Sequence, residues 1–83
     1  MFVSAAIKKL LKENGKSQAW MAERMGYAHQ SGMGQMLNRG TGVTVITLCR
    51  ICDIMGYEVT IQPRRAGKRP EGQIVIDLDE EGR

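Results

Sequence analysis

The chain has no long hydrophobic run, and none of its apolar stretches approaches the ~18 residues of a membrane span. Its beginning, MFVSAAIKKLLKENG, lacks the order of basic, apolar and cleavage regions that marks a secretory signal, so we expect a cytoplasmic protein. There are only two cysteines, which we expect to be reduced in that compartment. Neither a second C-x-x-C pair nor a pair of histidines is present, which argues against a zinc site.

Catalytic groups are equally scarce. The sequence offers no Ser/His/Asp set, no paired carboxylates on one helix face and no glycine-rich phosphate signature, and His29 is the only histidine. Cys49 and Cys52 form a single C-x-x-C pair, which is a redox motif, half of a zinc site or two small core residues. Their place in an apolar helical pattern favours the core interpretation. We therefore expect no enzyme, no cofactor and no metal.

Charge is divided unevenly along the chain. Residues 1–70 carry 11 basic and 4 acidic side chains, net +7, whereas residues 71–83 carry one arginine and five acids, net −4. A basic body with an acidic tail is typical of a nucleic-acid binder whose tail lies away from the phosphates. A solvated surface that happens to be basic is the alternative. The 83 residues suit one small domain, whose limited core would gain stability from oligomerisation.

Apolar residues recur at helical spacing in four segments, which predicts helices over residues 4–14, 17–25, 31–39 and 44–55. Suitable N-caps precede or begin them, namely Ser4, Ser17, Gln30 or Ser31, and Thr44. Glycines that can close a helix follow three of them at Gly15, Gly26 and Gly56. The predicted inward stripes comprise Ile7, Leu10 and Leu11; Met21, Ala22 and Met25; Met33, Met36 and Leu37; and Val45, Leu48, Ile51, Cys52 and Met55.

The spacing of apolar residues changes after Gly56. Residues 57–62 alternate with period two and are rich in β-formers, and QIVIDL at residues 73–78 does the same beyond a basic loop. We therefore predict a β-hairpin over residues 57–79, following a helical domain over residues 1–56 and preceding an acidic tail over residues 80–83. Because an isolated hairpin is barely stable, we expect this one to serve as a dimerisation element.

The central segment runs from Ser17 to Gly40 and contains two short predicted helices joined by a tight turn. Such a pair presents its second helix to the major groove of DNA. Gly32 and Gly34 are unusual inside that second helix, because each costs ~1 kcal/mol relative to alanine. They indicate either a frayed helix or a backbone that approaches a groove or phosphate closely.

Residues 17–56 resemble the XRE-type (phage repressor and Cro-like) helix-turn-helix family, through Ser17-Gln18, Met21-Ala22, Gly26, Met33, Gly40 and Met55-Gly56-Tyr57. The chain departs from the family pattern in a turn that is one residue longer, in Gly34 where serine is frequent, and in a missing late glutamate. A predicted hairpin also replaces the family's fifth helix. The resemblance implies a mainly α fold, a four-helix lambda-repressor-like helix-turn-helix domain, here with a C-terminal β-hairpin.

By the same resemblance, the protein would be a dimeric repressor of phage or mobile-element type that binds double-stranded DNA and acts by occupying its operator. Its candidate DNA contacts are Ser17, Gln18, His29, Gln30, Ser31, Gln35, Asn38 and Arg39, with phosphate contacts from Lys16, Arg64 and Arg65. A solvated loop is the simpler interpretation of Arg64 and Arg65. The alternative function is a protein-interaction module, antitoxin-like or a regulatory partner, that grips another protein through its strands or acidic tail.

Overall fold

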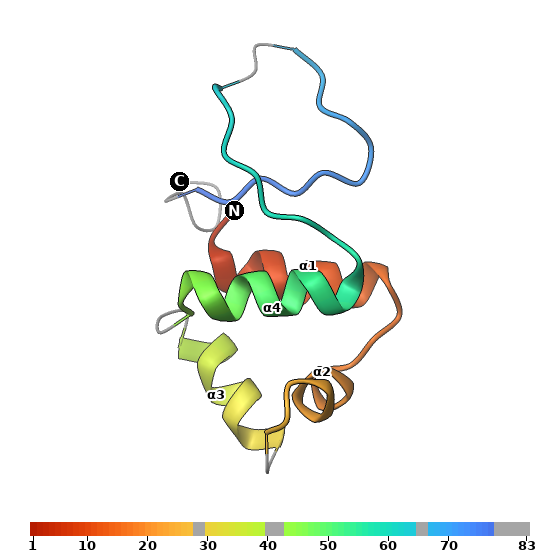
Figure 1. Ribbon diagram of the computed structural model, residues 1–83, viewed down its shortest axis with the longest axis vertical. Helices are drawn as coiled ribbons and strands as arrows, with labels where there is room; N and C mark the ends of the chain where they lie inside the picture. Colours follow the sequence, from red (N-terminus) through yellow and green to blue (C-terminus); the bar gives the residue numbers. More distant parts are fainter. Residues whose placement is uncertain (28–29, 40–42, 65–66, 78–83) are drawn as a thin grey trace.

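The computed structural model describes residues 1–27, 30–39, 43–64 and 67–77, with only the backbone for Gln30, Ser31 and Arg39 (Figure 1). This part of the chain is mainly helical and contains no strand. Its helices are α1 (Val3–Glu13), α2 (Gln18–Arg24), α3 (Gln30–Arg39) and α4 (Val45–Met55). The prediction of four helices is confirmed. None of them combines the length and the apolar character needed to cross a membrane.

The molecule measures 43 × 26 × 22 Å along its three principal axes. Its helices form two groups along the longest of these axes. In Figure 1, α1 and α4 run across the middle, α2 and α3 lie at one end, and the C-terminal segment lies at the other. All four helices contribute buried side chains to one core, namely Ile7, Leu10, Leu11, Met21, Ala22, Met33, Leu37 and Ile51. Every member of this core had been placed on an inward stripe from its spacing.

Local capping explains where α2 and α4 begin. The Ser17 hydroxyl accepts a hydrogen bond from the Trp20 N–H at 3.0 Å, and the Thr44 hydroxyl accepts one from the Thr47 N–H at 3.1 Å. Gly56 ends α4 in the left-handed conformation, with φ 81°, which glycine adopts at little steric cost. These caps confirm the predicted starts of α2 and α4 and the predicted end of α4.

Two predicted helix starts are wrong, and so is the predicted inward position of Val45. The first helix begins at Val3 after an N-cap at Phe2 that makes no side-chain bond, so Ser4 lies inside the helix and is buried. Ser31 also lies within its helix, because α3 already begins at Gln30. Val45 is 72 % exposed, and Ile46 beside it in the first turn of α4 is 71 % exposed, so the core covers neither residue.

The predicted β-hairpin is absent from the described residues. Residues 57–64 and 67–77 contain no strand, although both sides of the expected hairpin are described up to residue 77. The backbone N–H of Asp77 donates to the carbonyl of Met1 at 3.0 Å, and that of Gln73 donates to Pro70 at 3.2 Å. The second predicted strand therefore bonds to the N-terminus and to its own turn, and Ile74 packs on the helical core. Residues 78 and 79 and the acidic tail lie outside the described residues.

Candidate nucleic-acid interface

The unit formed by α2 and α3 occupies one end of the molecule. The two helices contact each other through buried residues, Met21 and Ala22 from α2 and Met33 and Leu37 from α3. Figure 1 shows α2 nearly along its axis while α3 lies across the view, so the two helices cross steeply. The small side chain of Ala22 suits this close crossing. Among the described residues of α3, Gln35 and Asn38 keep their side chains exposed, and Asn38 accepts a hydrogen bond from Lys8 of α1.

The outer side of α3 is polar and free of acidic groups. Gly32, Gln35 and Asn38 are exposed, and Gly34 is half-buried. The helix sequence QSGMGQMLNR contains no aspartate or glutamate. Side-chain amides can donate to and accept from base edges, and the absence of carboxylates avoids repulsion by phosphates. The surface therefore has the chemistry of a groove-reading helix.

The two glycines of α3 lie within one continuous helix, so the interpretation of a frayed segment is not supported. A Cβ atom at Gly32 would meet Tyr27 Cδ2 at 3.7 Å, and one at Gly34 would meet Gln18 Oε1 at 3.8 Å. Both distances are ordinary van der Waals contacts, and neither glycine has a left-handed φ. Neither internal packing nor backbone conformation therefore requires glycine at these positions.

The side chain of Gln18, the first residue of α2, lies near the middle of α3. Its side-chain oxygen lies beside the backbone at Gly34, and it follows Ser17, whose hydroxyl is occupied in capping α2. Four predicted contact residues with described side chains thus belong to the α2–α3 unit: Ser17 as the N-cap of α2, Gln18 in α2, and Gln35 and Asn38 in α3. Gln30, Ser31 and Arg39 belong to α3 by their backbone, and His29 lies outside the described residues.

Two cations lie against Trp20 of α2: Lys16, which precedes the helix, and Arg24, its last residue. Lys16 Nζ lies 4.8 Å from the centroid of the Trp20 ring, and the guanidinium carbon of Arg24 lies 5.3 Å from it. The ring attracts both cations through its electron-rich face. Spacing from the sequence placed Trp20 near the edge of the inward stripe and did not indicate its contacts with the two cations, although Trp20 and Arg24 are four residues apart, about one helical turn.

Two further basic residues, Lys8 and Arg64, lie in other parts of the structure. The Lys8 ammonium of α1 donates to Asn38 Oδ1 at 3.4 Å and so ties α1 to the end of α3. The two residues are 30 positions apart, and no local pattern in the sequence could have paired them. Arg64 is exposed and belongs to the C-terminal segment, and this segment lies at the opposite end of the molecule from α3 (Figure 1). Arg65 lies outside the described residues.

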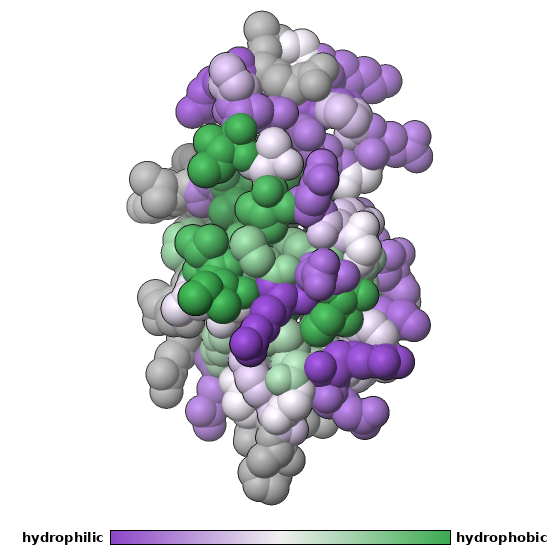
Figure 2. All heavy atoms as spheres, in the orientation of Figure 1, coloured by the Kyte–Doolittle hydropathy of each residue, from purple (hydrophilic) through white to green (hydrophobic). Residues whose placement is uncertain are grey.

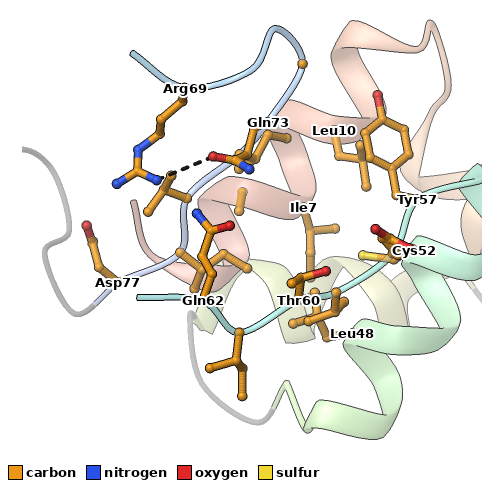
Figure 3. Close-up of a pocket in the computed structure, with 18 of the residues that line it drawn as sticks. Ile7, Leu10, Leu48, Cys52, Tyr57, Thr60, Gln62, Arg69, Gln73 and Asp77 are labelled. Carbon is orange, nitrogen blue, oxygen red and sulfur yellow. Dashed lines mark hydrogen bonds between the residues drawn. The ribbon is translucent and has the colours of Figure 1, made fainter. Parts of the chain in front are cut away.

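A hollow of about 860 Å³ separates the helices from the C-terminal segment. Figure 3 shows Ile7 and Leu10 of α1 and Leu48 and Cys52 of α4 on its helical side. The rest of its lining consists of Ala6, Gly56, Arg69 and residues 57–64 and 71–77. The hollow thus borders both segments that were predicted to pair as strands.

The two cysteines are free thiols with different surroundings. Cys49 is exposed, so the prediction that it belongs to the core is wrong, whereas Cys52 packs half-buried against the core. Burial, and secondarily the nearby Cys49, raises the pKa of the Cys52 thiol. Among the described residues, no group of three or more histidine, cysteine or acidic side chains is placed to hold a metal ion.

Comparison with protein-family models, curated proteins and solved structures finds no match to this chain. Its function therefore has to be inferred from the residues and the geometry described above.

Proposed function

We propose that the protein is a sequence-specific DNA-binding transcriptional regulator of the XRE helix-turn-helix type, with a lambda-repressor-like arrangement of its four helices. α3 is the reading helix, with Gln35 and Asn38 on its exposed side. Gln18, Lys16 and Arg24 contact the phosphate backbone. The protein represses transcription by occupying its operator as a homodimer.

The observation that carries the proposal is the pair of glycines in α3. Each lowers helix stability by ~1 kcal/mol relative to alanine, yet the structure has room for a methyl group at both. Among the described residues, no contact requires the absence of a side chain at either position. Gly32 is exposed and Gly34 is half-buried beside Gln18, and a helix without side chains at these positions lets another surface, such as a DNA groove, approach its backbone closely.

The charge of the chain supports DNA as that other surface. Residues 1–70 have a net charge of +7, and α3 itself contains no acidic residue. Exposed Lys16, just before α2, and exposed Arg24, at the end of α2, both lie against Trp20. Cations in this position favour phosphate contacts that fix the orientation of a reading helix.

A second candidate function is a protein-interaction module in which the helix-turn-helix is purely structural. The exposed aliphatic residues Val45, Ile46 and Ile61 favour it, because aliphatic residues gathered on a surface mark interaction sites. The α3 glycines and the basic charge favour DNA instead. The two candidates differ in how their binding should respond to salt.

The experiment is a titration of the protein on a selected duplex by fluorescence anisotropy at several salt concentrations. If α2 and α3 contact several phosphates, affinity should fall by orders of magnitude between ~50 and ~200 mM salt. Gln35→Ala should lower affinity for the selected duplex, whereas Gln73→Ala, an exposed glutamine outside the α2–α3 unit, should leave it unchanged. Affinity that is insensitive to salt and equal in both variants would refute the proposal.

A further inference from the structure

The hollow of about 860 Å³ between the helices and the C-terminal segment has an apolar floor. Ile7 and Leu10 of α1 and Leu48 and Cys52 of α4 line this side, and all four are buried or half-buried (Figure 3). On the face seen in Figure 2, hydrophobic side chains also gather over α4 and the base of the C-terminal segment, the parts of the chain that border the hollow. Its volume falls within the ~300–1,000 Å³ of small-molecule sites.

The C-terminal segment forms the other side of the hollow and is fixed at both ends. The Tyr57 N–H donates to the Cys52 carbonyl at 2.7 Å, and the Asp77 N–H donates to the Met1 carbonyl at 3.0 Å. Between these two anchors, the main-chain hydrogen bonds of the described residues comprise only the local one from the Gln73 N–H to Pro70, at 3.2 Å. The anchors hold the segment beside the helices, so a ligand in the hollow has two sides to contact.

Arg69 supplies a cation on the side of the hollow that faces the helices, and its side chain is half-buried. Among the described residues, Arg69 makes one side-chain hydrogen bond, from Nη1 to Gln73 Oε1 at 3.4 Å, and no ion pair. A guanidinium has five N–H donors in a planar fork, so most of them have no partner within the described chain. The amides of Gln62 and Gln73 extend toward the same part of the hollow (Figure 3).

The remaining charges of the lining restrict which anion Arg69 can receive. Glu58, Glu71 and Asp77 also line the hollow, and all three are exposed. They repel an anion with several charges, whereas a single carboxylate can bind a guanidinium through two parallel, charge-assisted hydrogen bonds. An aliphatic chain attached to that carboxylate would cover the apolar floor. The lining therefore suits a small aliphatic molecule that ends in one carboxylate.

We propose that this hollow binds an aliphatic monocarboxylate, with the carboxylate on Arg69 and the chain on Ile7 and Leu48. The ligand joins α1, α4 and the C-terminal segment. The hollow lies on the side of α1 and α4 away from α2 and α3, so it is separate from the candidate DNA interface (Figure 1). The inference goes beyond the proposed function and does not depend on it.

Protection of Cys52 from alkylation measures binding at this place. In a Cys49→Ala variant, Cys52 is the only thiol, and it lines the hollow. Its reaction with iodoacetamide is followed by mass spectrometry at increasing concentrations of octanoate, 1-octanol or acetate. Octanoate should slow the reaction and reach saturation. 1-Octanol, which lacks the charge, should need a concentration about tenfold higher or more for half-protection, and acetate, which lacks the chain, should give no protection.

Arg69→Gln, introduced into the same variant, tests the carboxylate contact. It should raise the octanoate concentration for half-protection about tenfold or more, and leave the concentration of 1-octanol unchanged. Arg50→Gln is the matched control, because Arg50 is an exposed arginine of α4 that does not line the hollow, and it should bind octanoate as the parent does. Circular dichroism of both variants should match the parent, since neither change alters a core side chain.

Methyl NMR of the unmodified chain gives a second measurement. Octanoate should shift the methyl resonances of Ile7 and Leu48, while Val45, an exposed residue outside the lining, should not move. An unchanged rate at Cys52, equal protection by octanoate and 1-octanol, an Arg69→Gln variant that responds like its parent, or a shift at Val45 as large as at Leu48 would each overturn the proposal. These measurements contain no DNA, so their outcome is independent of the DNA titration.

Discussion

Replacing Gly32 and Gly34 by alanine should stabilise the folded chain and weaken its binding to DNA. Each change should add about 0.8–1 kcal/mol of helix propensity. The new methyl groups would stand 3.7 Å from Tyr27 and 3.8 Å from Gln18, so no clash offsets this gain. The two contributions should nearly add, because the methyl groups meet different neighbours. The double variant should therefore unfold about 4–8 °C higher for each kcal/mol gained.

The effect on binding should have the opposite sign. If the α3 backbone approaches a DNA groove closely at these positions, an inserted methyl group should cost about 1–3 kcal/mol, as overpacking does elsewhere. Thermal unfolding followed by circular dichroism measures the first effect, and anisotropy with a selected duplex measures the second. Gln35→Ala in the same helix is the control, because it should lower affinity without the gain in stability that a glycine replacement brings.

Two results would refute this reasoning. A double variant that is less stable than the parent would mean that α3 is not a regular helix with room at both glycines. A double variant that is more stable and binds DNA with undiminished affinity would mean that the glycines do not serve close approach.

Three further predictions concern single side chains. Ser17→Ala and Thr44→Ala each remove an N-cap hydrogen bond, so each should lower the free energy of unfolding in urea by about 0.5–2 kcal/mol. Only Ser17→Ala should also weaken DNA binding. If both variants bind DNA with equal affinity, Ser17 caps α2 but does not belong to the DNA interface. Gln35→Ala should cost ~1–3 kcal/mol of binding and relax preference at one base position, and unchanged selectivity would remove Gln35 from the reading surface. Iodoacetamide should label Cys49 before Cys52, because burial raises the pKa of Cys52 and keeps its thiol protonated to higher pH; mass spectrometry showing the reverse order would contradict the described burial.

Features that depend on neighbouring residues could be predicted from the sequence. The caps at Ser17 and Thr44 and the left-handed glycine at Gly56 each involve groups within about one helical turn. The core stripes followed from helical spacing for the same reason. Periodicity could not decide which side of α4 faces inward at its first turn, because Val45 and Ile46 are both aliphatic. Both proved exposed.

Features that depend on distant groups or on another molecule could not be predicted in the same way. The contact between Lys8 and Asn38 joins residues 30 positions apart. The hairpin was expected from a period-two pattern, which indicates only which face of a strand would be apolar and not whether a partner strand pairs with it. For the site, the sequence placed Gln18 and Gln35 on the α2–α3 unit. It could not show that a methyl group fits at Gly32 and Gly34, because that depends on Tyr27 and Gln18 in space.

The most direct test of the central claim is selection of binding sites from a random pool of duplex DNA, with the purified protein at two salt concentrations. The account predicts enrichment of an inverted repeat whose half-sites are one helical turn apart, with recovery falling steeply at the higher salt. A folded, monodisperse protein that enriches no sequence at either salt concentration would contradict it.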